Sequence, residues 1–180
     1  MKKNLVAVVI TFDKKTNDKI IDSWEILKKK FNVKFISSRS PKPHLTIKSG
    51  FVGNIPYFLN QIKKKKFKKL KLNSLGFGVF ANKHPLLYIR WEQNKKLLKL
   101  YNSIDKICSA NFLKKSKNSE YLHWVAKTSI AYKDFKYHNL SKILKNLEKI
   151  KLLKNIQVQK IEVMKIDKNG EKIIFTNNLI

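Results

Sequence analysis

Two short segments with the same order of residue types, one in each half of the chain, constrain the fold most strongly. The first is His44-Leu45-Thr46-Ile47, which follows a proline-rich turn at 40–43, and the second is Lys127-Thr128-Ser129-Ile130. Each places a hydroxyl residue two positions after a basic residue, and each precedes an expected helix. Residues i and i+2 of a β-strand lie on the same face. The basic and hydroxyl side chains of each segment are therefore expected side by side, with Leu45 and Ile47 in the core.

Side chains paired in this way suit a phosphate group. The imidazole of His44 and the hydroxyl of Thr46 can both donate hydrogen bonds to one phosphate, and histidine can exchange a proton near neutral pH. Lys48 and Arg39 flank the first segment, and either could contact a substrate phosphate. These residues are the first candidates for a functional site.

The rest of the chain alternates between strand-like and helix-like patterns. We expect helices at 18–31, 56–66, 94–110 and 140–153, and strands at 5–12, 33–37, 44–52, 70–80, 86–91, 123–132, 156–166 and 172–175. The segment 111–120 is polar and is expected to form a loop. Turns at 82–85 and 167–170 join neighbouring strands into hairpins. This layout favours an α+β protein with largely antiparallel sheets.

The chain is strongly basic, with a formal net charge of +28 from 40 Lys and Arg against 12 Asp and Glu. Such a charge attracts nucleic acid or an anionic membrane, but it also arises from a lysine-biased composition. Arg39 and Arg90 are the only arginines. Dedicated nucleic-acid binders typically use arginine, so the scarcity of arginine favours composition over nucleic-acid binding as the source of the charge. Anionic ligands are still attracted, more weakly at high salt.

Several functional classes are excluded by what the sequence lacks. Cys108 is the only cysteine, which precludes an intramolecular disulfide and favours a reducing compartment, so we expect a cytoplasmic protein. The apolar run 5–12 is interpreted as a first strand rather than a signal peptide, and no run is long enough to span a membrane. There is no glycine-rich phosphate loop, no Cys/His metal cluster and no Gly-x-Ser-x-Gly segment. The chemistry narrows to acid–base catalysis or simple binding.

In their order along the chain these segments resemble the 2H phosphoesterases, which include the 2'-5' RNA ligase and 2',3'-cyclic phosphodiesterase group. The likeness rests on Pro43-His44-Leu45-Thr46-Ile47-Lys48, on 75–80 and 86–89 before the helix from Asn94, and on the closing hairpin 161–175. It implies one domain over residues 1–180. This domain would have two pseudo-symmetric lobes of mainly antiparallel sheet, helices on the outer faces and a central cleft. The family's two His-x-Thr/Ser motifs would face each other there, at 44–46 and 127–129.

The second motif departs from the family pattern, because Lys127 stands where a histidine is expected, with Ser129 as its hydroxyl partner. His123 is an alternative, but on a regular strand it would lie about 13 Å from position 127. Val125, rather than a hydroxyl residue, follows it two positions later. Only a bulge or bend would bring His123 to the required place.

The resemblance implies hydrolysis of a 2',3'-cyclic phosphate, in which one histidine activates water and the other protonates the leaving ribose oxygen. His44 would be the base or the acid, and Thr46 and Ser129 would orient the phosphate oxygens. Lys127 would supply positive charge, or a proton if burial lowers its pKa. The expected partner is RNA or a small nucleotide with a cyclic or 2'-5' bridging phosphate, bound by a monomer with no membrane contact. The family needs no metal or organic cofactor.

Two other functions stay open. The protein could be a pseudoenzyme that binds RNA or nucleotide phosphates and has lost turnover, which the lysine at position 127 and the high charge both fit. It could instead be a basic structural or ribosome-associated protein, in which His44 and Lys127 would lie on separate surfaces. His84 is expected to be exposed and inert, His138 to have no functional role, and Trp124 to lie in the core.

Overall fold

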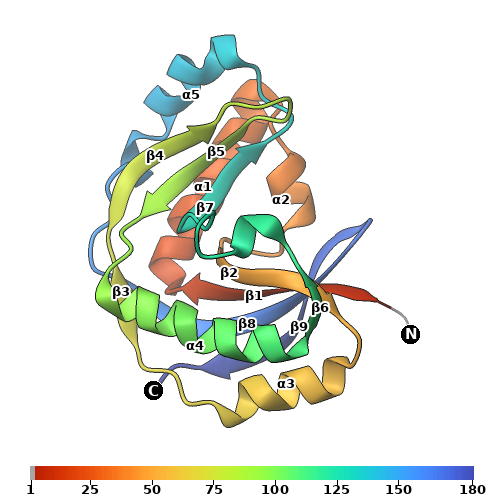
Figure 1. Cartoon of the computed structure of the whole chain (residues 1–180). Coiled ribbons are helices and arrows are strands. Elements are labelled where there is room, and N and C mark those ends of the chain that lie inside the picture. Colours follow the sequence, from red (N-terminus) through yellow and green to blue (C-terminus); the bar gives the residue numbers. More distant parts are fainter. Residues whose placement is uncertain (1–2) are drawn as a thin grey trace.

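The structure, a computed structural model, describes residues 3–180 and contains two antiparallel sheets (Figure 1). The larger sheet has the strand order β3-β8-β1-β2-β6, and β9 also pairs with β8. Its strands are β1 (Asn4–Phe12), β2 (Leu45–Val52), β3 (Leu70–Leu72), β6 (Phe112–Lys115), β8 (Ile156–Asp167) and β9 (Gly170–Asn178). The smaller sheet has the order β4-β5-β7, formed by β4 (Ser74–Phe80), β5 (Leu86–Trp91) and β7 (Lys127–Tyr132).

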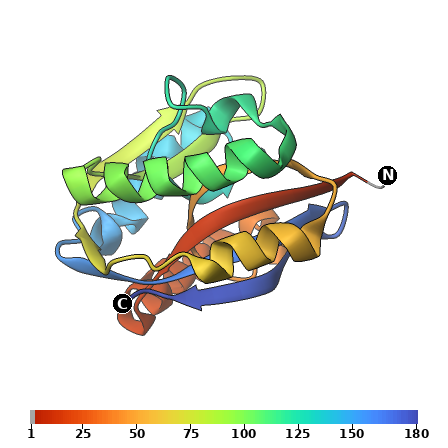
Figure 2. The same ribbon diagram turned by 60° about the horizontal axis from the view of Figure 1, so that its bottom comes forward.

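The helices cover the outer faces of the two sheets. The bounds are α1 (Lys14–Phe31), α2 (Phe35–Arg39), α3 (Ile55–Lys64), α4 (Lys95–Asn111) and α5 (Leu140–Asn146), with short 3-10 helices at Lys117–Ser119, Tyr137–Asn139 and Glu148–Ile150. Helices α3 and α4 lie side by side against the larger sheet (Figure 2). Helices α1 and α2 contact β7 of the smaller sheet, and α5 packs against α1. Side chains of Asp13, Asn54 and Asn94 cap α1, α3 and α4 by accepting a backbone N–H three residues later.

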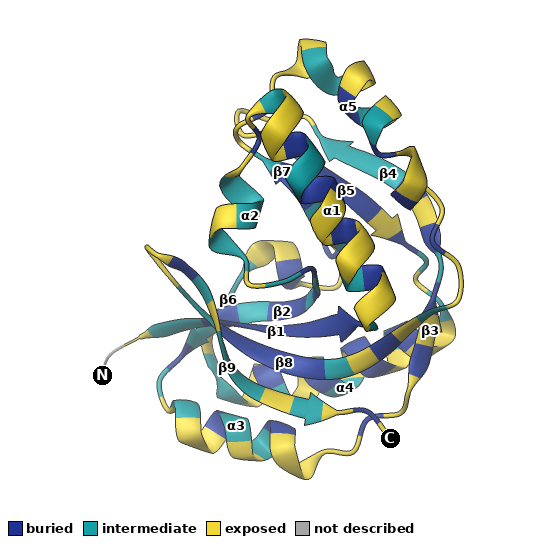
Figure 3. Cartoon of the chain, turned by 180° about the vertical axis from the view of Figure 1, so that it is seen from behind, coloured by how far each residue is buried: buried dark blue, intermediate teal, exposed yellow. Residues whose placement is uncertain are grey.

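One hydrophobic core joins both sheets. It includes Val8 and Ile47 of the larger sheet and Leu87 and Trp91 of the smaller sheet, all at most 1% exposed. Strand β1 is a continuous apolar run rather than an alternating one, because it is buried on both faces, as the dark strands of Figure 3 show. The predicted fold class, α+β with mainly antiparallel sheets and outer helices, is confirmed. Among the described residues, no helix is both long and apolar enough to cross a membrane.

Some expected elements were wrong, and in each case contacts from distant residues decide the outcome. The segment 33–37 is not a strand, because the Asp134 carboxylate accepts the N–H groups of Lys34 and Phe35 and starts helix α2 there. The expected strand 70–80 is divided between two sheets, where hydrogen bonds between Ser74 and Leu153 hold the chain at the bend.

Three further boundaries differ from the sequence-based expectation. The polar segment 111–120 contains β6, which pairs with the edge of β2. The helix expected over 140–153 ends as an α-helix at Asn146 and continues as a 3-10 turn. The strand expected from His123 begins only at Lys127, and His123 lies in the preceding turn, where its N–H bonds to Glu120.

Candidate functional site

The first motif lies on a strand that contains a bulge. On β1, Val9 pairs with Thr46 and Val8 pairs with Lys48, so Ile47 is the extra residue on β2. This insertion reverses the alternation of side chains. Thr46 and Ser49 consequently share the face that lines a cavity, while Ile47 and Lys48 are both buried away from it.

The second motif has the same construction. On β5, Leu87 pairs with Ala131 and Tyr88 pairs with Ser129, so Ile130 is the extra residue on β7. Partly exposed and buried residues follow one another in the same order from position 44 to 49 and from position 127 to 132. The two motif strands are therefore equivalent in backbone geometry, and Lys127 occupies the position on β7 that His44 occupies relative to β2.

A cavity of about 910 Å³ brings the two strands together. Thr46 and Ser49 line it from β2, and Lys127, Ser129 and Tyr132 line it from β7. Further walls come from α2, the β4–β5 hairpin, the loop 116–125 and the β8–β9 hairpin. This volume is large enough for a nucleotide.

His44 lies directly before β2, with a side chain 16% exposed. Its Nδ1 atom lies 3.1 Å from the carbonyl oxygen of Lys42 and 3.4 Å from the Ser40 hydroxyl. A carbonyl can only accept, so Nδ1 carries the proton in this hydrogen bond. In the neutral imidazole Nε2 then keeps its lone pair. His44 is not itself among the lining residues, but Ser40 and Glu171, which it approaches, are.

Glu171 connects the two motifs. Its Oε2 atom lies 4.0 Å from Nδ1 of His44, and its charge also acts on the ammonium of Lys127. Burial lowers the pKa of Lys127, and the Glu171 carboxylate opposes that shift. A pair of cationic or proton-exchanging groups around one carboxylate can bind an anion and move protons to or from it.

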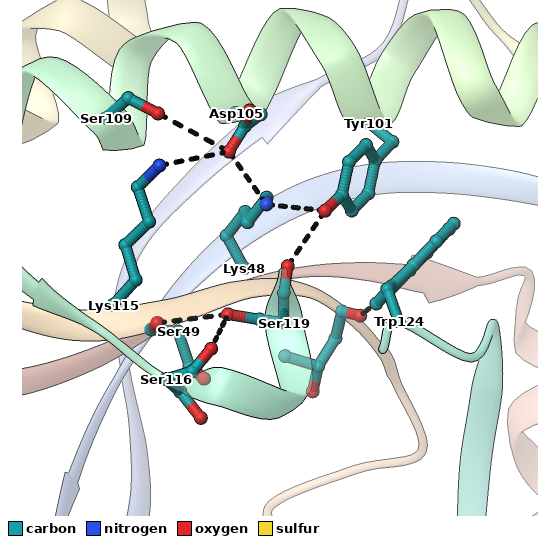
Figure 4. Close-up of polar contacts among 10 residues, drawn as sticks. Lys48, Ser49, Tyr101, Asp105, Ser109, Lys115, Ser116, Ser119 and Trp124 are labelled. Atoms are coloured by element: carbon teal, nitrogen blue, oxygen red, sulfur yellow. Dashed lines mark hydrogen bonds and ion pairs between the residues drawn. The ribbon is translucent and has the colours of Figure 1, made fainter. Parts of the chain in front are cut away.

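Lys48 lies outside this cavity, although the sequence made it a candidate phosphate ligand. The bulge turns its side chain to the other face of β2, where it is 2% exposed. Its ammonium donates to the Tyr101 hydroxyl and lies 2.7 Å from the Asp105 carboxylate (Figure 4). We therefore leave Lys48 out of the proposed phosphate-binding residues.

Arg39 lines the cavity, but its guanidinium is hydrogen-bonded to backbone carbonyls of the β8–β9 hairpin. Its Nη2 atom donates to the carbonyl oxygens of Asp167 and Lys168, at 3.2 and 2.8 Å, in the turn between β8 and β9. These bonds hold that hairpin against α2. Arg39 therefore positions Glu171, which follows the turn.

The cluster of polar side chains around Lys48 supports one wall of the cavity (Figure 4). The Tyr101 hydroxyl donates to the Ser119 carbonyl at 2.8 Å, and burial raises its pKa, which keeps it protonated. Trp124, which is buried as expected, donates from Nε1 to the Thr46 carbonyl at 2.8 Å. The loop 116–124 is thus tied to the strand that carries the first motif.

Sequence reasoning gave no part in the site to His84 and Glu171, which both line the cavity. His84 is exposed, as expected. His123, which the sequence offered only as an alternative to Lys127, also lines the cavity. Glu171 carried no signal of its own beyond its place after the Asp167–Gly170 turn. Among residues 3–180, no group of three His, Cys, Asp or Glu side chains is arranged to hold a metal ion.

No protein-family model and no curated protein sequence matches the chain. Solved structures match over almost its whole length. E. coli LigT complexed with 3'-AMP has a TM-score of 0.61 at 12% identity, covering 99% of each chain. TT0787 of Thermus thermophilus has a TM-score of 0.63 at 10% identity, covering 97% of each chain. Kluyveromyces marxianus Usb1 has a TM-score of 0.53 at 11% identity, covering 98% of this chain and 99% of its own. These neighbours have the 2H phosphoesterase fold, and at such identities the likeness establishes that shared fold alone.

Proposed function

We propose that this protein is a 2H-type phosphoesterase, formed by one domain over residues 1–180. It would act without a metal ion on RNA ends or small nucleotides that carry a 2',3'-cyclic or 2'-5' phosphodiester. One observation carries the proposal: two equivalently bulged strands direct Thr46, Lys127 and Ser129 into one cavity, with His44 linked to it through Glu171. The shared fold with nucleotide-bound LigT supports the same interpretation.

His44 is the proposed base. Because Nδ1 is hydrogen-bonded to the Lys42 carbonyl, Nε2 is the atom that accepts a proton from water. The water oxygen bonds to phosphorus, and the bond between phosphorus and one ribose oxygen breaks. The hydroxyls of Thr46 and Ser129 donate to the two non-bridging oxygens, where negative charge develops.

Lys127 is the proposed group on the leaving side. Its ammonium stabilises the developing charge and donates a proton to the leaving ribose oxygen, which becomes a hydroxyl. Burial lowers the pKa of Lys127 and makes this donation less unfavourable than for an exposed lysine. Exchange with solvent then removes the proton from His44 and restores that of Lys127. The product is a phosphomonoester.

The second candidate function is binding of nucleotide phosphates without turnover. The observation that favours it is the lysine at position 127, since an ordinary lysine pKa of 10.5 suits proton exchange at neutral pH poorly. Loss of one general acid or base typically lowers a rate by about 10²–10⁴-fold. A slow enzyme and a binding protein differ only in turnover.

Hydrolysis of adenosine 2',3'-cyclic phosphate, followed by chromatography, tests the proposal. We expect slow formation of adenosine monophosphate by the wild type and none by His44→Ala. The matched control is His138→Ala, which removes an exposed imidazole outside the cavity and should keep the wild-type rate. Equal turnover in His44→Ala and wild type would exclude His44 as the base. Saturable binding without any product would favour the second candidate.

A further inference from the structure

A partly buried carboxylate lies where the proposed reaction calls for positive charge. Glu171 lines the cavity beside His44 and Lys127. Its Oε2 atom is buried and has no hydrogen-bond partner among the residues that the structure describes. The whole chain has only 12 acidic residues against 40 basic ones. An acidic side chain in a cavity proposed to bind anions therefore requires a functional explanation.

The placement of Glu171 is built into the fold. The preceding residue, Gly170, has a φ of +130°, and a Cβ atom there would lie 2.6 Å from the Arg39 carbonyl oxygen. Arg39 in turn donates hydrogen bonds to the carbonyls of Asp167 and Lys168. The chain is thus held against α2 on both sides of the turn, and Glu171, the second residue of β9, lines the cavity.

Glu171 is the only acidic residue among the described residues that line the cavity. The charged lining residues are Arg39, Lys127 and Glu171, and the Arg39 guanidinium is bound to the hairpin carbonyls. The Glu171 carboxylate is therefore the negative charge that an anion bound beside Lys127 would meet.

We propose that Glu171 is a specificity residue, which lets the cavity accept singly charged phosphodiesters and reject doubly charged phosphomonoesters. This inference rests on the proposed function and specifies the substrate's charge. A phosphodiester carries one negative charge, whereas a phosphomonoester gains a second above about pH 6. Like charges in a partly buried site repel more strongly than in water. Hydrolysis creates the second charge beside Glu171, which promotes release of the product.

Calorimetric titration at pH 8 with two ligands that differ by one charge tests the inference without relying on turnover. The ligands are 2'-O-methyladenosine 3'-phosphate and its methyl ester, which share base and sugar and cannot cyclise. The variant is Glu171→Gln, which keeps the size of the side chain. Glu171→Asp retains the charge. Glu148→Gln is the matched control, because it removes an exposed carboxylate outside the cavity.

We expect Glu171→Gln to strengthen binding of the phosphomonoester about 10-fold more than that of the diester, because one repulsive unit charge is removed. Glu171→Asp and Glu148→Gln should keep the wild-type ratio of the two affinities. If both ligands bind the wild type and Glu171→Gln changes both affinities by the same factor, the inference is wrong and the proposed function stands. If neither ligand binds the wild type, the proposed function fails together with the inference.

Discussion

The ion pair between Lys48 and Asp105 leads to an asymmetric prediction for stability. The Lys48 ammonium is buried, while the Asp105 carboxylate, 2.7 Å away, is 34% exposed. The ammonium also lies 4.3 Å from the centre of the Tyr101 ring, and Lys115 lies 3.8 Å from the same carboxylate. Removing the carboxylate therefore leaves a buried charge, whereas removing the ammonium leaves a carboxylate with water and Lys115 as partners.

The loss in free energy of unfolding depends on which partner of the ion pair remains in the variant. Removing one partner of a fully buried ion pair costs about 3–5 kcal/mol. Because Asp105 is partly exposed and the Tyr101 hydroxyl stays as an acceptor, we expect Asp105→Ala to cost about 2 kcal/mol. For a domain of this size that lowers Tm by roughly 4–8 °C. Replacing the buried ammonium in Lys48→Met should change the free energy of unfolding by less than about 1 kcal/mol.

Urea denaturation of both variants measures these differences. The double variant Lys48→Met/Asp105→Ala should resemble Lys48→Met alone, because the carboxylate has no buried charge left to neutralise. Asp22→Ala is the matched control, since it removes an exposed aspartate from α1. A larger loss of stability in Lys48→Met than in Asp105→Ala would show that the unpaired buried ammonium is not the costly partner.

Three further predictions concern the cavity and the core. Burial lowers the pKa of Lys127, so its charged form opposes folding below that pKa. Lys127→Met should therefore gain stability over the wild type at neutral pH, and urea titrations should show this gain shrinking as the pH rises towards 10.5. Gly170→Ala should lower the free energy of unfolding by about 1–3 kcal/mol, because φ is +130° there. An unchanged urea midpoint would show that an alanine is not strained at this position. Burial raises the pKa of Cys108, so N-ethylmaleimide at pH 7 should label it only in urea; rapid labelling of the folded protein would contradict that burial.

The elements that carry strong local patterns could be predicted from the sequence. The strand expected at 86–91 is β5 with the same ends, and the helix expected from Asn94 begins at Lys95 with Asn94 as its cap. Apolar periodicity and a side chain that caps its own helix are both local signals. The position of the first motif at the start of β2 follows from the same kind of signal.

The features that shape the site are not local. Whether Lys48 faces the cavity depends on the bulge at Ile47, which exists only in the pairing of β2 with β1. The pattern of 33–37 is typical of a strand, but a helix forms there because Asp134, about a hundred residues later, accepts the N–H groups at its start. Glu171 reaches the cavity only because Gly170 and Arg39 bring the β8–β9 hairpin to α2. Contacts between residues so far apart cannot be predicted from the local sequence pattern.

We propose that Lys127 occupies the place of the second histidine in a two-motif phosphoesterase site. The decisive experiment measures turnover of adenosine 2',3'-cyclic phosphate by Lys127→His. We expect a rate about 10²–10⁴-fold above that of the wild type, because a second group that exchanges protons near neutral pH is restored. His44→Ala in the same background should remove that gain. A folded Lys127→His variant that binds the nucleotide but hydrolyses it no faster than the wild type would contradict the claim.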